Sequence, residues 1–152
     1  MTAEQALEYT HGRVTMNLTV RLATYLRASP AGRLCPPGTR FTTSRSPDTV
    51  RTPDIAFIRA DRLPDREPAA TAPPMPDLVV DILSPKDRPL EIQSRAGEWL
   101  AAGTSLVWVV DPRRCTVHVY RADGTEEFVG SSGALNGEEL LPGFSCPLNE
   151  IF

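Results

Sequence analysis

Lysine is nearly absent from this sequence, which contains one lysine, Lys86, beside 15 arginines. Any chemistry that needs a lysine amine therefore has a single candidate. Cysteine is also scarce: the three cysteines lie far apart and form no Cys-x-x-Cys spacing. This scarcity argues against a disulfide framework and against a structural zinc site. We therefore expect reduced thiols and a cytoplasmic protein.

Long hydrophobic runs are missing as well. No apolar stretch approaches the roughly 18 residues of a membrane span, so no membrane partner is expected. The N-terminus lacks the basic start and apolar middle of a signal peptide. The two histidines, His11 and His118, are isolated, and no Gly-x-Ser-x-Gly motif occurs, which argues against a serine hydrolase.

The length and composition suit one domain over residues 1–152. Hydrophobic residues make up 41% of the sequence, which is enough to build a core. The net charge of −3 is unevenly distributed: residues 1–66 carry +4 and residues 67–152 carry −7. A protein that depends mainly on phosphate contacts is usually more basic overall. The front part of the chain could still hold a positive face.

The hydrophobic pattern predicts one α/β domain. Apolar residues at helical spacing predict a long first helix that ends at Pro30, and Pro89 and Gly103 frame a second helix over 89–102. Strands are predicted over 39–43, 54–59, 78–83, 106–110, 116–121 and 126–129. Residues 61–76 form a proline-rich loop, and the tail is expected to be a packed irregular segment.

Asp81 is the most informative residue, because it interrupts the apolar run at 78–83. A carboxylate in a strand that is covered on both faces costs several kcal/mol unless a cation or hydrogen-bond donors satisfy it. Two interpretations follow. Asp81 pairs with an arginine in a structural role, or it serves catalysis or binds a hard metal cation.

A second carboxylate for such a site must come from another strand. Asp77 shares a strand face with Asp81 but stands ~13 Å away at ~3.3 Å per residue, so we assign it a surface or turn role. Asp54, just before the apolar residues 55–58, is the natural partner. Its alternative is ordinary turn chemistry, since it follows a proline.

Five blocks of sequence carry a resemblance to a known family. They are TPDIAF at 52–57, PDLVVDILSP at 76–85, WVVDP at 108–112, VHVYR at 117–121 and LPGF at 141–144. Over about residues 11–152, their order resembles the bacterial restriction-endonuclease-like family that was long described as a domain of unknown function. That family belongs to the PD-(D/E)XK nuclease superfamily. The stretch before His11 is shorter than is usual in the family, so an opening hairpin is expected to be missing or degenerate.

The resemblance implies a restriction-endonuclease-like α/β core, in which a mixed sheet is flanked by helices. It also implies hydrolysis of phosphodiester bonds in DNA with Mg²⁺ or Mn²⁺. Asp54 and Asp81 would be the catalytic carboxylates and metal ligands. A metal ion suits this reaction because it activates a water molecule and neutralises the charge that builds on the phosphate oxygens.

The sequence departs from the family pattern at two positions. Asp81 stands where the family usually has glutamate, and Leu83 stands where the superfamily motif has lysine. Family members often carry a lysine on the following helix, at the place of Arg95. Arginine can bind water or phosphate but is a poor general base. Lys86 is the reserve catalytic candidate, and a solvated loop lysine is its alternative.

Several interpretations stay open. Arg95 either forms a surface ion pair with Glu91 or faces Asp81, where it completes the site or neutralises it. His11 is expected to be partly buried and hydrogen-bonded, with contact to the site as the alternative. We favour a DNA endonuclease. A degenerate nuclease fold that acts as a binding or assembly module, a nuclease that needs a partner to bind DNA, and a homodimer are the other possibilities.

Overall fold

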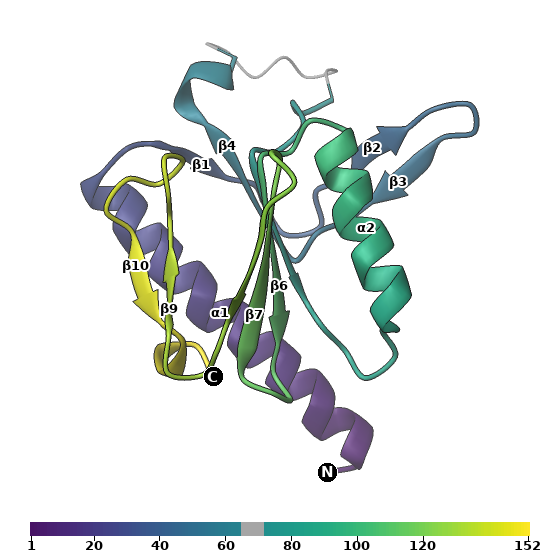
Figure 1. The fold of residues 1–152 in the computed structure, drawn as a ribbon, viewed down its shortest axis with the longest axis vertical. Coiled ribbons are helices and arrows are strands. Elements are labelled where there is room, and N and C mark those ends of the chain that lie inside the picture. Colours follow the sequence, from purple (N-terminus) through teal and green to yellow (C-terminus); the bar gives the residue numbers. More distant parts are fainter. Residues whose placement is uncertain (65–71) are drawn as a thin grey trace.

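The computed structural model describes residues 1–64 and 72–152 (Figure 1). Within these residues, six strands form one mixed sheet in the order β1-β4-β5-β6-β7-β8. Their bounds are β1 Gly32–Leu34, β4 Ile55–Arg59, β5 Leu78–Ile82, β6 Leu106–Asp111, β7 Thr116–Arg121 and β8 Glu126–Val129. The central strands β5 and β6 run parallel, and the other neighbouring pairs are antiparallel. The predicted α/β fold with a mixed sheet is confirmed.

Two helices cover opposite faces of this sheet. Helix α1 (Ala3–Ala28) begins at a capping box between Thr2 and Gln5, which satisfies two backbone N–H groups of its first turn. Helix α2 (Pro89–Ala101) has proline in its first turn and ends before Gly103, whose φ is +115°. In the part of the chain that the structure describes, neither helix is long and apolar enough to cross a membrane.

The strand β5 is buried on both faces. Leu78 and Val80 pack in the cluster under α1, whereas Val79 packs in the cluster under α2. Because side chains alternate along a strand, Asp81 faces the α2 side together with Val79. Trp108 is buried in the cluster under α1 and Trp99 in the cluster under α2.

The C-terminal segment is more regular than predicted. Strands β9 (Ala134–Asn136) and β10 (Ser145–Pro147) pair antiparallel and are followed by the 3₁₀ helix η2 (Leu148–Glu150). The expectation of a packed irregular tail holds for residues 137–144, where Leu141 and Phe144 are buried, and is wrong for the strands on either side. Strands of three residues are too short for an alternating pattern to reveal them.

A second small sheet projects beside α2 (Figure 1). It pairs β2 (Phe41–Ser44) with β3 (Thr49–Arg51). The sequence predicts β2 but misses β3 and β1, which are again three residues long. The predicted loop at 61–76 starts with the 3₁₀ helix η1 (Ala60–Arg62), and its residues 65–71 lie outside the described part.

Asp77 is buried, contrary to the surface or turn role predicted for it. The residue is 4% exposed. Its Oδ2 accepts a hydrogen bond from the Arg59 N–H at 2.8 Å, and its Oδ1 pairs with Arg62 Nη1 at 2.7 Å. The carboxylate therefore ties the end of β4 to the start of β5.

Candidate active site

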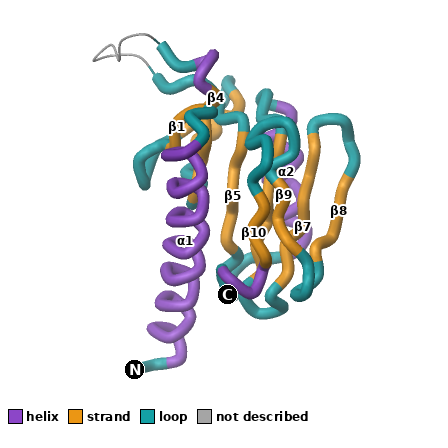
Figure 2. The backbone as a smooth tube through the Cα atoms, turned by 90° about the vertical axis from the view of Figure 1, so that its left-hand side faces the viewer, coloured by secondary structure: helices purple, strands orange, loops and turns teal. Residues whose placement is uncertain are grey.

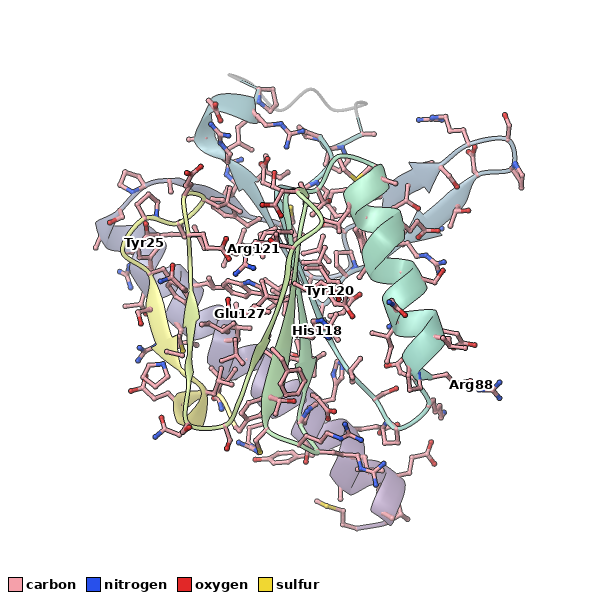
Figure 3. The ribbon with its side chains drawn as sticks, in the orientation of Figure 1. Tyr25, Arg88, His118, Tyr120, Arg121 and Glu127 are labelled. Carbon is pink, nitrogen blue, oxygen red and sulfur yellow. The ribbon has the colours of Figure 1, made fainter. Side chains whose placement is uncertain are left out.

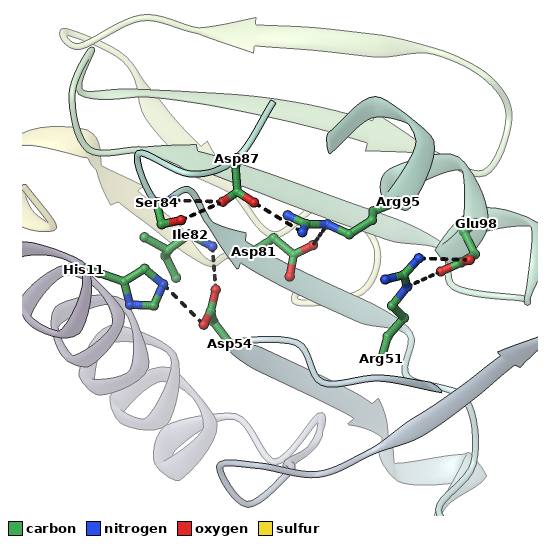
Figure 4. Close-up of polar contacts among 9 residues, drawn as sticks. All are labelled: His11, Arg51, Asp54, Asp81, Ile82, Ser84, Asp87, Arg95 and Glu98. Atoms are coloured by element: carbon green, nitrogen blue, oxygen red, sulfur yellow. Dashed lines mark hydrogen bonds and ion pairs between the residues drawn. The ribbon is translucent and has the colours of Figure 1, made fainter. Parts of the chain in front are cut away.

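Two aspartates meet where the pairing of β4 with β5 ends (Figure 4). Ile55 lies opposite Val80, and one further step along the same antiparallel ladder puts Asp54 opposite Asp81. Both aspartates line a cavity of about 330 Å³. The structure thus brings together the two residues that the sequence analysis selects as metal ligands.

Asp54 is oriented from two sides. Its Oδ2 accepts a hydrogen bond from the Ile82 N–H at 2.7 Å, and its Oδ1 lies 3.4 Å from His11 Nε2 on α1. The backbone therefore fixes one carboxylate oxygen, while the other faces the imidazole. His11 is partly buried, as expected, and its ring faces Asp54, so the structure supports the alternative of contact with the site.

Asp81 carries a perturbed carboxyl group. Its side chain is 15% exposed, and this burial raises its pKa from 3.8 to about 6. The Arg95 guanidinium lowers this pKa, whereas the neighbouring carboxylates Asp54 and Asp87 raise it. A carboxyl whose pKa is shifted by burial and by specific charges inside a cavity is characteristic of functional sites.

Arg95 reaches the same cavity from α2. Its Nε lies 3.9 Å from Asp81 Oδ2, and its Nη1 lies 3.3 Å from Asp87 Oδ1. Asp87 is itself held, because it accepts hydrogen bonds from the Ser84 N–H at 2.9 Å and from the Ser84 hydroxyl at 3.3 Å. Of the two interpretations of Arg95, the structure supports the one facing Asp81, and Glu91 is exposed on α2.

The Nε of Arg95 is buried and, among the described residues, has no hydrogen-bond partner. Its 3.9 Å separation from Asp81 exceeds hydrogen-bonding range. A buried donor without an acceptor costs about 1–3 kcal/mol, and in natural proteins such a donor commonly marks a place for water or a ligand. The cavity therefore suits an additional group with an acceptor oxygen, such as a phosphate.

Lys86 stands apart from this cavity. Its side chain is 88% exposed, and its Nζ lies 3.8 Å from Glu4 Oε1 on α1. The cavity is lined by other residues. This position is that of a solvated loop lysine, the alternative that the sequence analysis gives for Lys86.

A family model matches nearly the whole chain. Residues 3–149 match the model named Uma2, described as a putative restriction endonuclease. This chain belongs to the Uma2 family. The resemblance drawn from the five sequence blocks is confirmed.

A solved structure resembles this Uma2 member in fold. It is the crystal structure of a "putative nuclease belonging to DUF820" from Anabaena variabilis, which matches with a TM-score of 0.78 and 21% sequence identity. The match covers 94% of this chain and 80% of the other chain. At this identity the likeness concerns the fold alone. Among curated proteins, none matches this chain.

Arg51 is a residue of this Uma2 site that the sequence analysis misses. It lines the cavity from the end of β3, and its guanidinium is held by Glu98 of α2, with Nε 2.7 Å from Oε2. The hydrogen bond between them raises the pKa of Arg51 and lowers that of Glu98, so both groups stay charged. No sequence signal points to Arg51. Asp87, which the sequence analysis also misses, could have been found from the Ser84-x-x-Asp87 spacing, because an aspartate three residues after a serine can accept hydrogen bonds from it in a turn.

The donor set of the Uma2 site fits Mg²⁺. Over residues 1–64 and 72–152, no group of three or more His, Cys, Asp or Glu side chains is arranged to hold a metal ion. Mg²⁺ nevertheless keeps several waters and is usually bound by one or two carboxylates together with substrate phosphates. Asp54 and Asp81 would supply these two carboxylates, and the unpaired Nε of Arg95 would be a donor for a phosphate.

Proposed function

We propose that this chain is a DNA endonuclease that depends on Mg²⁺, or on Mn²⁺ in its place, and hydrolyses phosphodiester bonds. The observation that carries the proposal is the position of Asp54 opposite Asp81 on two neighbouring strands, in a cavity that also holds the partly buried guanidinium of Arg95. The description of the family model supports the reaction class. A metal ion bound by the two aspartates would activate water and neutralise phosphate charge.

The protein groups have separate tasks in this proposal. Asp54 and Asp81 would hold the cation, and the Ile82 N–H keeps one oxygen of Asp54 in place. Arg95 would donate its unpaired Nε to a phosphate oxygen. Because arginine stays protonated in proteins, Arg95 can stabilise negative charge but does not take a proton from water.

A larger groove next to the cavity offers a path for the nucleic acid. It has a volume of about 900 Å³ and contains Arg113 and Arg114 of the β6–β7 turn. His118 and Tyr120 line it as well, and their rings stack with centroids 4.1 Å apart (Figure 3). Arginines that contact phosphates and aromatic rings that contact bases are common in sites that bind nucleic acid strands. DNA is therefore the proposed partner.

The direct test of the proposal is cleavage of supercoiled and single-stranded DNA by the full chain in Mg²⁺ or Mn²⁺. We expect cleavage that EDTA abolishes and that Asp54→Asn lowers at least about 100-fold, since metal catalysis supplies several kcal/mol. Asp48→Asn, at an exposed turn, makes the same chemical change away from the cavity and should cleave like the wild type. Equal rates for the two variants would contradict the assigned ligands.

Replacing Arg95 should change both the rate and its pH dependence. Arg95 lowers the pKa of Asp81, so Arg95→Met should raise the pH at which Asp81 ionises and binds Mg²⁺. We also expect cleavage at pH 8 to fall about 100-fold, because a donor to the phosphate is lost. Calorimetric Mg²⁺ titrations between pH 5 and 8 measure the first effect.

Lys86→Met is the matched control for Arg95→Met, because it removes the same charge from an 88% exposed side chain. We expect its Mg²⁺ binding and cleavage to stay within about twofold of the wild type. A loss of activity in Lys86→Met without loss in Arg95→Met would assign the cationic role to the lysine instead.

The second candidate function is that of a binding or assembly module, in which the nuclease fold no longer hydrolyses phosphodiester bonds. It is favoured by the pairing of Arg95 with Asp81, by the distance of Lys86 from the cavity and by the net charge of −3. This candidate requires that the cavity binds no Mg²⁺. Calorimetry at pH 8 separates the two functions, because only the nuclease should show saturable Mg²⁺ binding that Asp54→Asn removes.

A further inference from the structure

Helix α1 carries a second apolar stripe on the side that faces away from the sheet. Val14 and Leu18 on its inner side are completely buried. Tyr9, Met16 and Val20 are 65%, 68% and 56% exposed. With about 100° per residue, these three side chains fall within about 40° of the helix circumference, opposite Val14 and Leu18. The helix is therefore apolar on two faces, of which the sheet covers one.

Among the residues that the structure describes, none covers the large side chains of the outer stripe, which are more than half exposed. Figure 2 shows α1 at the margin of the molecule, with the sheet on one side and no other described element beyond the helix. Two small residues, Gly12 and Ala23, lie on the same stripe by helical spacing. A side chain at Gly12 would meet no atom within 4 Å. Large exposed apolar side chains beside small ones form a surface into which another helix can pack.

We propose that α1 pairs with α1 of a second copy of this chain in an antiparallel, two-fold symmetric dimer. The two-fold axis would pass beside Met16, so that Met16 meets the same residue of the second copy. Symmetry then brings Val20 level with Gly12 and Tyr9 level with Ala23, because the members of each pair lie equally far from Met16. Large side chains thus lie against small ones on both halves of the contact, as a self-complementary interface requires.

The charges of α1 favour the antiparallel direction. Glu8 is exposed in the N-terminal part of the helix at the edge of the stripe, and Arg27 is exposed in its last turn. In the proposed dimer, Arg27 lies level with Gln5 of the second copy and therefore within one helical turn of its Glu8. A parallel pairing would instead align Glu8 with Glu8 and Arg27 with Arg27. Opposite charges across an interface select the partner and its orientation.

The dimer leaves the candidate active site free. His11, which contacts Asp54, lies about 140° around the helix from Met16 at about 100° per residue. The stripe also differs from a membrane-binding face, because the exposed Arg13 and Thr24 border it closely on one side. A narrow apolar band between polar residues suits one further helix. A second copy fits this band, because its α1 presents an arginine near one end and a glutamate near the other.

Sedimentation velocity of the full chain tests the dimer. We expect the wild type at 50–100 µM to sediment with twice the monomer mass of 16.6 kDa, because a dissociation constant of roughly 1 µM is enough to keep most chains dimeric at these concentrations. Met16→Glu should sediment as a monomer, because it places two carboxylates together on the axis. Circular dichroism should show that Met16→Glu remains folded, since Met16 is 68% exposed. A monomeric wild type, or a dimer that Met16→Glu leaves intact, overturns the proposal.

Disulfide cross-linking tests the direction and register. Under mild oxidation, Met16→Cys should form a covalent dimer, because residue 16 meets its own copy at the axis. Thr24→Cys is the matched control: residue 24 lies eight positions from the axis, so the two copies would stand ~24 Å apart along the helices at ~1.5 Å per residue. The wild type controls for the three native cysteines. Equal cross-linking of Met16→Cys and Thr24→Cys would rule out this antiparallel register.

Discussion

Asp81→Asn is expected to abolish metal-dependent cleavage and, at the same time, to stabilise the folded protein at neutral pH. Asparagine removes one of the two carboxylates proposed to hold the cation, so we expect a loss of at least about 1,000-fold in rate. It also removes a negative charge that burial disfavours, as the raised pKa of about 6 records. The opposite signs of the two effects distinguish this variant from one that merely fails to fold.

The stability effect has a defined pH dependence. Because the folded protein holds the Asp81 proton more tightly than the unfolded chain does, ionised Asp81 destabilises the fold increasingly as pH rises from 3.8 to about 6. The gain from Asp81→Asn should therefore grow from under about 1 kcal/mol near pH 4 to about 2–3 kcal/mol above pH 7. Urea unfolding of the metal-free protein at both pH values measures it.

The same experiment separates the two candidate functions. If Arg95 and Asp81 form a structural ion pair, Asp81→Asn removes a partner from a partly buried guanidinium and destabilises the fold. Arg95 also contacts Asp87, which can keep the guanidinium paired when Asp81 is neutral. A stabilised variant that has lost the cleavage shown by the wild type supports the nuclease, whereas a destabilised variant of a wild type that does not cleave supports the assembly module. Asp48→Asn, at an exposed position, should change neither quantity.

Asp77→Ala is expected to destabilise the fold by about 2–4 kcal/mol without touching the cavity. The substitution leaves the Arg59 N–H without its acceptor and takes from Arg62 an ion pair whose carboxylate is 5% exposed. Each buried group without a partner costs about 1–3 kcal/mol, and breaking a buried pair is among the larger effects of single substitutions. Urea unfolding at pH 7 should show a lower midpoint with an unchanged slope.

Asp61→Ala is the internal comparison for this prediction. Asp61 pairs with Arg59, but both side chains are more than half exposed, and exposed ion pairs contribute ~0–1 kcal/mol. We expect Asp61→Ala to change the free energy of unfolding by less than about 0.5 kcal/mol. Similar losses for Asp61→Ala and Asp77→Ala would show that burial of Asp77 does not govern its contribution.

The helices and the longer strands could be predicted from the sequence because their signals are local. Apolar residues at helical spacing mark α1, and a proline at the start with a glycine after the end marks α2. The strands β1, β3, β9 and β10 could not be predicted in the same way. Each has three residues, so its existence depends on the strand with which it pairs rather than on its own pattern.

The candidate site was predictable only where a residue contradicted its surroundings. Asp81 could be found because a carboxylate interrupts an apolar run, and Asp54 followed from the need for a partner and from the family resemblance. Arg51 could not be found, because only the folded position of β3 brings it to the cavity. The role of Asp77 was predicted wrongly for a related reason. Its spacing from Asp81 is visible in the sequence, but the Arg59 N–H from which it accepts a hydrogen bond belongs to another strand.

Because Asp54 lies opposite Asp81 on the neighbouring strand, the site forms only when β4 and β5 pair in the correct register. Side chains alternate between the two faces of a sheet, so a shift of β4 by one residue against β5 would send Asp54 to the face covered by α1. No intermediate arrangement keeps both carboxylates on one face at a slightly altered separation. Molecules that fold with the wrong register should therefore lack the site altogether, and the specific activity of a preparation would report the fraction of correctly paired chains.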